Sequence, residues 1–229
     1  MYLSSWTIHP IYIEKFQKNI LRQQIQILQN IVSRKGSSKV LTFSIPHVFK
    51  ALQLLCLDKF VSRSKFCKEL HLGEGAIKTL ILHLKDVKMV DTTKSGTYLT
   101  VKGKKFSENL NRVLKKEFKL SKCKIAPSKH NHAIILKNYS YAIKTGLEQR
   151  DYAILYGSSG CVTLLYKNSR FIFPGEGRDC LEDEPTTRKK LFENLSPEDG
   201  DVIIISSSDD PFVAEVSAKN SALWTLATN

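Results

Sequence analysis

Residues 62–100, SRSKFCKELHLGEGAIKTLILHLKDVKMVDTTKSGTYLT, hold the pattern that decides the fold of this chain. Ser62 or Ser64 can cap a first helix, because a serine oxygen accepts a hydrogen bond from a free N–H of the first turn. Leu72 and Gly73 mark a turn, since glycine accepts the backbone angles that end a helix. A second helix is predicted from about residue 74 to about residue 87. Its inward face is set by 3.6-residue spacing and consists of Ile77, Leu80, Ile81, Leu84 and Val87.

Two short runs rich in β-forming residues, 89–93 and 97–100, follow the second helix. Lys94, Ser95 and Gly96 lie between them, which predicts a tight hairpin. The order of helix, turn, helix and hairpin is that of a winged helix-turn-helix, which places its second helix in the major groove of DNA. Helix-turn-helix-hairpin units also serve as protein–protein modules, so the pattern alone leaves both alternatives open.

The outward face of the second helix and the hairpin loop supply the candidate DNA-binding residues. On the helix, the side chains expected to face bases are Lys78, Thr79, Leu82 and His83. The side chains expected to contact phosphates are Lys85, Lys94, Ser95 and, on a following basic helix, Lys102. Cations on that following helix either track the DNA backbone or only solvate the helix surface.

Charge is divided unevenly along the 229 residues, whose net charge is +13. Residues 1–129 carry 25 Lys and Arg against 8 Asp and Glu, a net charge of +17, whereas residues 130–229 have a net charge of −4. The basic half suits a polyanion, and the release of counterions would drive its binding. The two halves are therefore expected to have different partners.

Four segments are predicted from these shifts in composition and pattern. They are an N-terminal helical extension (1–39), the winged helix (40–120), a linker (121–131) and a C-terminal domain (132–229). The extension contains one helix, about 10–34, whose apolar stripe is Ile13, Phe16, Ile20, Ile27 and Ile31 and whose polar face is Gln23, Gln24, Gln26, Gln29 and Asn30. It either packs on the domain or forms a dimer, since paired half-sites need two-fold symmetry.

Within the winged helix, Ser44 is expected to cap a helix that ends near Asp58, and Thr100 a long helix through about Lys119. In the C-terminal domain the predicted order is β-α-β-β-α-β-α, with residues 202–205 as a strand covered on both faces. The expected fold class is thus α+β, with helices covering a small sheet in an α/β sandwich.

Two stretches of the C-terminal domain are denser in polar groups than packing requires. Their candidate pocket residues are Glu148, Gln149, Arg150 and Asp151, and Ser206, Ser208, Asp209 and Asp210. If the stretches meet at the end of a strand and the start of a helix, they form a ligand pocket. The alternative is ordinary helix polarity beside a capping cluster.

The sequence contains none of the motifs that mark common catalytic sites, namely GxSxG, a P-loop, HExxH or GxGxxG. Its five cysteines lack CxxC spacing, and His130 and His132 lack a third ligand, so no metal, cofactor or disulfide framework is expected. No apolar run has the length of a membrane span. A protein of the reducing cytoplasm is therefore expected.

The blocks LTVKGKKF (99–106), GLEQRDYAILYG (146–157), VTLLY (162–166), FIFPG (171–175) and GDVIIISSSDDPFVAE (200–215) resemble an archaeal family of predicted winged-helix regulators. The resemblance covers about residues 42–228, and the C-terminal domain of that family has no assigned function. Ser206 to Ser208 replace a turn richer in glycine and alanine, and the N-terminal helix falls outside the resemblance.

These observations lead us to expect a non-enzymatic transcriptional regulator that binds double-stranded DNA. Its C-terminal domain would sense a small-molecule effector or mediate assembly, for example as a homodimer. The alternative is an enzyme or nucleic-acid-processing protein anchored by the winged helix. Its candidate residues would be Arg150, Asp151, Asp209 and Asp210.

Overall fold

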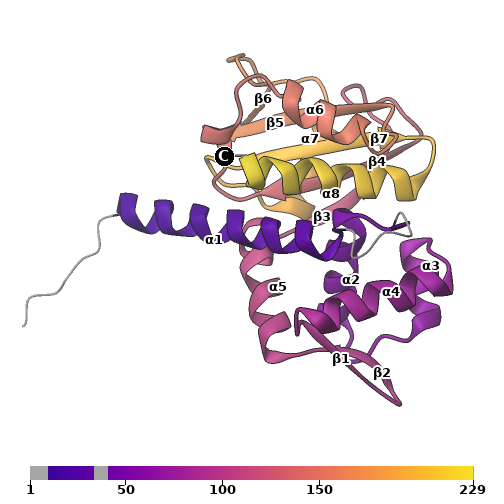
Figure 1. Ribbon diagram of the computed structural model, residues 1–229. Helices are drawn as coiled ribbons and strands as arrows, with labels where there is room; N and C mark the ends of the chain where they lie inside the picture. Colours follow the sequence, from indigo (N-terminus) through magenta and orange to yellow (C-terminus); the bar gives the residue numbers. More distant parts are fainter. Residues whose placement is uncertain (1–9, 34–40, 229) are drawn as a thin grey trace, which may run out of the picture.

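Figure 1 shows the computed structural model, which describes residues 10–33 and 41–228, with side chains from residue 19 onward. The predicted arm before Pro10 and the predicted helix end at Arg34 lie outside the described residues. The elements of the basic half are α1 (Pro10–Ile31), α2 (Ile45–Leu57), α3 (Arg63–Leu70), α4 (Glu74–Asp86), β1 (Val90–Thr93), β2 (Gly96–Leu99) and α5 (Val101–Val113).

The predicted hairpin is present and lies against the loop before α3. β1 and β2 pair antiparallel, with Val90 opposite Leu99 and Thr93 opposite Gly96. Gly96 has a φ of 132°, and a Cβ there would lie 2.8 Å from the carbonyl oxygen of Val61. Thr97 exchanges two backbone hydrogen bonds of 2.9 Å with Val61. A glycine is therefore required at this point for the wing to approach the helical core.

The predicted long helix after Thr100 is wrong in its second half. Thr100 does cap α5, because its hydroxyl accepts a hydrogen bond from the N–H of Gly103. The helix ends at Val113, and β3 (Glu117–Leu120) then pairs antiparallel with residues 131–134 of the next strand. The second sheet therefore begins within the segment predicted to be winged helix, and part of the predicted linker is strand.

From residue 117 onward the chain forms a five-stranded antiparallel sheet covered by helices, so the fold class is α+β as predicted. The strand order is β3-β4-β7-β5-β6, and all four neighbouring pairs are antiparallel. The remaining elements are β4 (His130–Leu136), the short helix η1 (Ser140–Ala142), α6 (Leu147–Ile154), β5 (Gly160–Lys167), β6 (Arg170–Ile172), α7 (Pro185–Leu195), β7 (Val202–Ser208) and α8 (Pro211–Thr228).

Side chains of β7, the central strand, alternate between the two faces of this sheet. Ile203 and Ile205 join the core that contains Leu191 of α7, whereas Val202 and Ile204 join the core that contains α8. All seven residues of β7 are buried, which confirms the prediction of a strand covered on both faces.

Helix α8 is the element that joins the two halves. Its apolar residues share one continuous core with the winged helix, and α1 and α2 both pack against it (Figure 1). In α1 the buried side chains are Leu21, Gln24, Ile25, Leu28 and Ile31. Gln24 was predicted on the polar face, but its Nε2 donates to the carbonyl oxygen of Phe106 at 3.3 Å. The described part of α1 therefore packs on its own chain; the side chains of Ile13 and Phe16 lie outside the description.

A buried cluster of charged side chains lies where α2, α8 and β3 meet. Lys219 of α8 is fully buried and forms ion pairs with Glu117 of β3 and with Glu215, the latter at 3.3 Å. Glu215 also binds Lys50 of α2 at 2.7 Å, and Glu117 binds His132 at 3.2 Å. The cluster ties the winged helix to the sheet through charges that are paired inside the protein.

Candidate nucleic-acid interface

The helix-turn-helix begins and turns through identifiable local contacts. The Ser62 hydroxyl accepts a hydrogen bond from the N–H of Lys65, which confirms the predicted cap of α3. The left-handed residue that ends α3 is His71, with a φ of 53°, whereas Gly73 has a φ of −69° and precedes α4. The turn was predicted in the right place, but the histidine takes the conformation expected of the glycine.

A groove of about 480 Å³ lies between α4, the start of α3 and the hairpin, which we call the wing. Its cations come from separate elements: Arg63 from α3, Lys78 and Lys85 from α4, and Lys94 from the tip of the wing. The other residues that line it are Val61, Ser62, Ile81, Leu82, Thr92, Thr93, Ser95, Gly96 and Thr97. The wing lies at the end of the molecule away from the sheet (Figure 1).

Five of the eight predicted DNA-binding residues line this groove, namely Lys78, Leu82, Lys85, Lys94 and Ser95. Lys78 and Lys94 are exposed, and Leu82 is 51% exposed on the surface of α4. Thr79 is half-buried, and its hydroxyl donates to the carbonyl oxygen of Gly75 within the same helix. These positions follow from the 3.6-residue spacing of the buried residues of α4.

Lys85 also holds the wing in place. Its Nζ lies 2.9 Å from Asp91 Oδ1 and 3.2 Å from Thr92 Oγ1, both on β1. The hydrogen bond from Lys85, together with the N–H of Thr92, lowers the pKa of Asp91. Lys85 therefore fixes the distance between α4 and the wing, in addition to its charge in the groove.

One predicted base contact is corrected by the structure, and one predicted phosphate contact lies outside the groove. His83 is buried: its Nδ1 lies 2.6 Å from the carbonyl oxygen of Ile31, and its ring packs edge-on against Phe43 with centroids 5.7 Å apart. It joins α4 to the end of α1 and does not face the groove. Lys102 is exposed but is not among the groove residues, and its Nζ donates to the carbonyl oxygen of Val87 at 2.8 Å. That hydrogen bond satisfies a free carbonyl at the end of α4.

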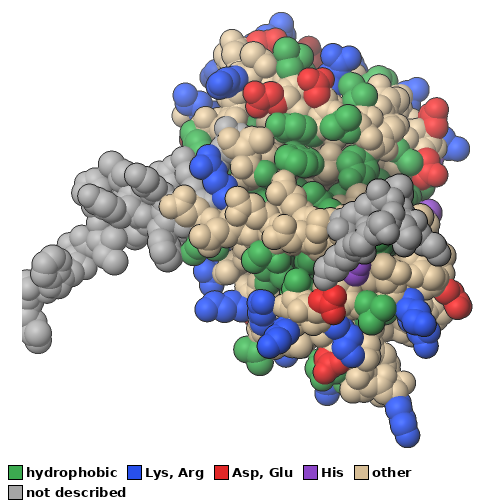
Figure 2. All heavy atoms as spheres, in the orientation of Figure 1, with side chains coloured by type: hydrophobic (Ala, Val, Ile, Leu, Met, Phe, Trp, Pro, Cys, Tyr) green, Lys and Arg blue, Asp and Glu red, His purple; other side chains and the backbone are tan. Residues whose placement is uncertain are grey.

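Sequence reasoning missed Arg63 and Thr93, which also line the groove. The predicted cap at Ser62 was the signal available for Arg63, because the residue after a cap is the first residue of the helix. Figure 2 shows Lys and Arg side chains over both halves of the molecule, with one at the end of the wing.

Residues of the two polar stretches that were predicted to form a ligand pocket contact opposite ends of α8. Gln149 is buried and donates to Thr225 Oγ1 at 3.1 Å, near the end of α8, whereas Asp210 caps its beginning. Residues 210 and 225 are separated by about 22 Å along such a helix. The carboxyl ends of strands do not gather at one edge of this sheet, because it is antiparallel.

The serines of the second stretch have intramolecular partners. Ser206 Oγ donates to Ser158 Oγ at 2.9 Å, and Ser208 Oγ accepts from the N–H of Asp210 at 3.2 Å. Asp210 Oδ1 accepts from the N–H groups of Phe212 and Val213, and these backbone bonds lower its pKa. Asp209, Glu148, Arg150 and Asp151 are exposed. The arrangement supports a capping role for Ser208 and Asp210.

No group of three or more metal-ligating side chains is present in the described ranges. Within the same ranges, none of the helices combines the length and hydrophobicity that a membrane-spanning segment needs.

Residues 127–226 match a family model described as "Domain of unknown function (DUF4443)". Among solved structures, the chain is similar to a hypothetical protein from Pyrococcus horikoshii OT3, with 27% sequence identity and a TM-score of 0.63. That similarity covers 79% of this chain and 91% of the other. No curated protein matches the chain. These similarities support the expected likeness to an archaeal family with a domain of unknown function.

Proposed function

We propose that this protein is a transcriptional regulator that binds double-stranded DNA, with α4 in the major groove and the wing against the backbone. The observation that carries the proposal is the groove in which Arg63, Lys78 and Lys94 converge from α3, α4 and the wing. A winged helix uses these same elements for DNA, and the charges suit phosphates.

Leu82 supports readout of bases as well as attraction to phosphate. Leu82 is 51% exposed among the lysines of the groove, so about half of its side chain has no apolar contact in the protein without DNA. In a complex with DNA, the methyl groups of thymine in the major groove would provide that contact. Lys78 stands one turn before Leu82 on the same face of α4 and is long enough to reach a guanine edge.

For the C-terminal half we place assembly ahead of effector sensing. The side chains expected to bind an effector are either bonded within the chain, as for Gln149 and Ser206, or exposed on a helix surface. Catalysis by Asp210 is also disfavoured, because its carboxylate already caps α8.

The proposal is tested by DNA affinity across a range of salt concentrations. Lys78→Glu combined with Lys94→Glu should weaken binding and reduce the slope of log K against log salt by about 2, because each lysine is expected to neutralise one phosphate. Lys167→Glu combined with Lys144→Glu makes the same charge change at exposed positions of the C-terminal half and is the matched control. Equal affinity and slope for both double variants would exclude the proposal.

A further inference from the structure

Helix α5 stands on the side of the winged helix that is opposite α3 (Figure 1). Its inward face is fixed by Phe106 and Leu110, which are buried in the core. Its outward face carries Lys104, Lys105 and Arg112, all of them exposed. These three side chains share one face, because residue 112 follows residues 104 and 105 by eight and seven positions. The packing of α5 therefore directs three positive charges outward together.

Two shallow grooves run along this outward face. The first has a volume of about 580 Å³, lies between α5 and α1, and contains Lys104, Lys105 and Arg112. The second has a volume of about 540 Å³ and contains Arg112 and Lys115. Both grooves include Arg112 and Glu108, so they form one continuous surface. We call this surface the α5 face and define it by Lys104, Lys105, Arg112 and Lys115.

The positive charges of the α5 face are not neutralised by the chain itself. None of its four cations forms an ion pair with a carboxylate in the described ranges. Glu108 adds one negative charge between them, which leaves an excess of three positive charges along a single helix. Such an excess attracts a polyanion and is screened by salt.

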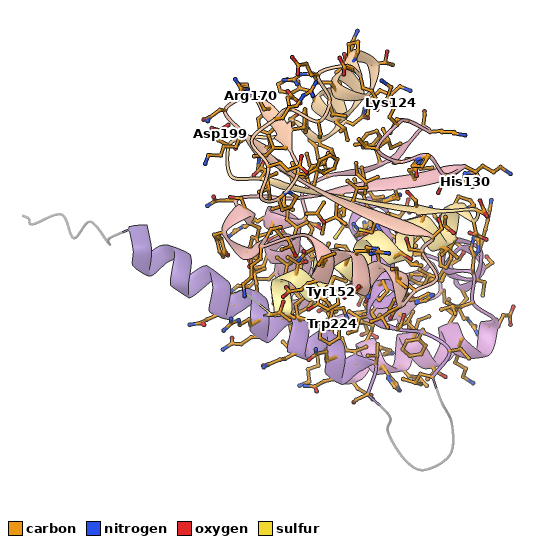
Figure 3. The ribbon with its side chains drawn as sticks, turned by 90° about the horizontal axis from the view of Figure 1, so that it is seen from above. Lys124, His130, Tyr152, Arg170, Asp199 and Trp224 are labelled. Atoms are coloured by element: carbon orange, nitrogen blue, oxygen red, sulfur yellow. The ribbon has the colours of Figure 1, made fainter. Side chains whose placement is uncertain are left out.

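The α5 face ends at the edge of the sheet, where the cations are paired. Lys137 forms an ion pair of 2.6 Å with Asp201. At the same edge, Asp199 Oδ2 accepts a hydrogen bond of 3.1 Å from the N–H of Asn168, and Asp199 lies beside Arg170 in Figure 3. A polyanion bound along α5 would therefore stay on the winged helix and would not extend over the sheet.

We propose that the α5 face binds the backbone of a second segment of double-stranded DNA, while the groove between α4 and the wing holds the first. Lys105 and Arg112 are about 10 Å apart along the helix. A DNA strand has one phosphate about every 3.4 Å along its axis, so both side chains can contact the same stretch of one strand. Contacts of lysine and arginine with phosphates carry no sequence information, and binding at the α5 face is therefore independent of sequence.

The two DNA segments do not compete for the same side chains. The groove between α4 and the wing shares no residue with either groove of the α5 face. An acidic protein surface is the alternative partner for such a face. DNA is favoured because the α5 face belongs to the half of the chain with a net charge of +17, which also carries the proposed DNA groove. DNA held in that groove raises the local concentration of further DNA near α5.

This inference rests on the proposed function, since it takes double-stranded DNA as the ligand of both surfaces. It adds that one chain holds two DNA segments together. The test uses random-sequence duplex DNA fixed to beads and a fluorescent copy of the same duplex in solution. The original full-length chain, bound to the beads, should retain the fluorescent duplex.

Lys105→Glu combined with Arg112→Glu should reduce the fluorescent duplex retained per bead-bound protein by about tenfold or more, because two phosphate contacts are replaced by repulsion. The variant should still bind the beads through the groove between α4 and the wing. Lys144→Glu combined with Lys167→Glu makes the same charge change at exposed positions elsewhere and is the matched control, which should retain the fluorescent duplex. Circular dichroism verifies the fold, and Lys105→Gln with Arg112→Gln replaces the first variant if it does not fold.

Retention that is equal in the α5 variant and in the original chain would overturn the inference, since two copies or another surface would then join the duplexes. An original chain that binds the beads but retains no fluorescent duplex would also overturn it, as expected if the α5 face binds an acidic protein, and would leave the proposed function intact. Loss of all bead binding in the α5 variant, with full bead binding by the Lys78→Glu, Lys94→Glu variant, would instead contradict the groove between α4 and the wing as a DNA site.

Discussion

The imidazole of His71 lies flat on the ring of Phe212, with ring centroids 4.1 Å apart and an angle of 7° between the planes. His71 ends α3 in the left-handed conformation, and Phe212 stands in the first turn of α8. The stacked pair joins the turn of the helix-turn-helix to the helix that covers the C-terminal sheet. The orientation of α4 therefore depends on α8, which makes the C-terminal half part of the proposed DNA-binding apparatus.

Phe212→Ala should destabilise the fold and weaken DNA binding together. Besides stacking on His71, the ring lies against His47 with centroids 5.7 Å apart and is 5.1 Å from Lys50 Nζ, so the substitution removes three ring interactions at once. We expect a decrease of about 1–2 kcal/mol in the free energy of unfolding, measured by urea denaturation. Phe192→Ala, at a phenylalanine that is 51% exposed on α7, is the control and should leave both properties nearly unchanged. Equal effects of the two substitutions would remove the role assigned to Phe212.

His47 should make stability depend on pH in mildly acidic solution. Burial, then the charges of Lys50 and His71, lower the pKa of His47 from 6.5 to about 4. The backbone N–H of Ser44 donates to His47 Nδ1 at 3.3 Å, a bond that needs the unprotonated nitrogen. Between pH 6.5 and 4 the unfolded chain therefore binds a proton that the folded chain does not, so stability falls as the pH falls.

The measurement is the free energy of unfolding at several pH values in this window. His47→Gln keeps an acceptor for the N–H of Ser44 and removes the titrating group, so its stability should vary less with pH than that of the original chain. His130→Gln, which replaces a histidine with no such bond to a helix start, serves as the control. A slope unchanged by His47→Gln would show that other groups cause the pH dependence.

Lys219→Met should be among the most damaging substitutions in the chain. Burial raises the pKa of Glu117, but the charge of Lys219 and the hydrogen bond with His132 outweigh it and hold the pKa of that carboxyl far below its usual 4.5. Removal of Lys219 leaves Glu117 without its main counter-charge, and Glu215 without one of its two lysines, at a cost of about 3–5 kcal/mol.

This deficit should shrink in acid. Because the pKa of Glu117 is depressed by folding, the stabilisation it provides is complete well above pH 4.5 and is lost as the pH falls below that value. The free energies of unfolding of Lys219→Met and of the original chain should therefore differ by the full amount at pH 7 and converge as the pH falls from 4.5 to about 3. A deficit of the same size at pH 7 and at about pH 3 would contradict the account of the buried cluster.

Leu82→Ala should reduce sequence discrimination while leaving the salt dependence of DNA binding unchanged. The substitution removes apolar contact to base edges but no charge, so the ratio of specific to non-specific affinity should fall about tenfold. Leu57→Ala, which shortens a leucine that is 83% exposed at the end of α2, is the matched control. A change in the salt slope with Leu82→Ala would contradict the assignment of Leu82 to the bases and of the lysines to the phosphates.

The wing and the outward face of α4 could be predicted from the sequence because local patterns decide them. Gly96 and the β-forming runs predict the wing, and the spacing of Ile77, Leu80, Ile81 and Leu84 determines which side chains of α4 face outward. His83 was misplaced because its partner, the carbonyl oxygen of Ile31, comes from a helix outside the winged-helix pattern. Gln24 was misplaced for the same reason, since its partner Phe106 is 82 residues away.

Pairing between distant residues also explains the wrong prediction for residues 114–120 and the unpredicted burial of Lys219. The spacing of Leu110, Leu114 and Phe118 suits a helix, but residues 117–120 find backbone partners in β4, and those partners decide the outcome. Lys219 is buried in α8 although no local pattern indicates it, because its counter-charge Glu117 lies 102 residues away.

The most direct test of sequence-specific DNA binding is selection from a pool of random-sequence duplexes, carried out in parallel with the original chain and with the Lys78→Glu, Lys94→Glu double variant. The original chain should enrich a discrete motif and bind it about 10³-fold or more tightly than scrambled DNA at physiological salt, whereas the double variant should enrich none. Failure of the original chain to enrich any motif, or enrichment of the same motif by both proteins, would contradict the assignment of the groove between α4 and the wing as the surface that reads DNA.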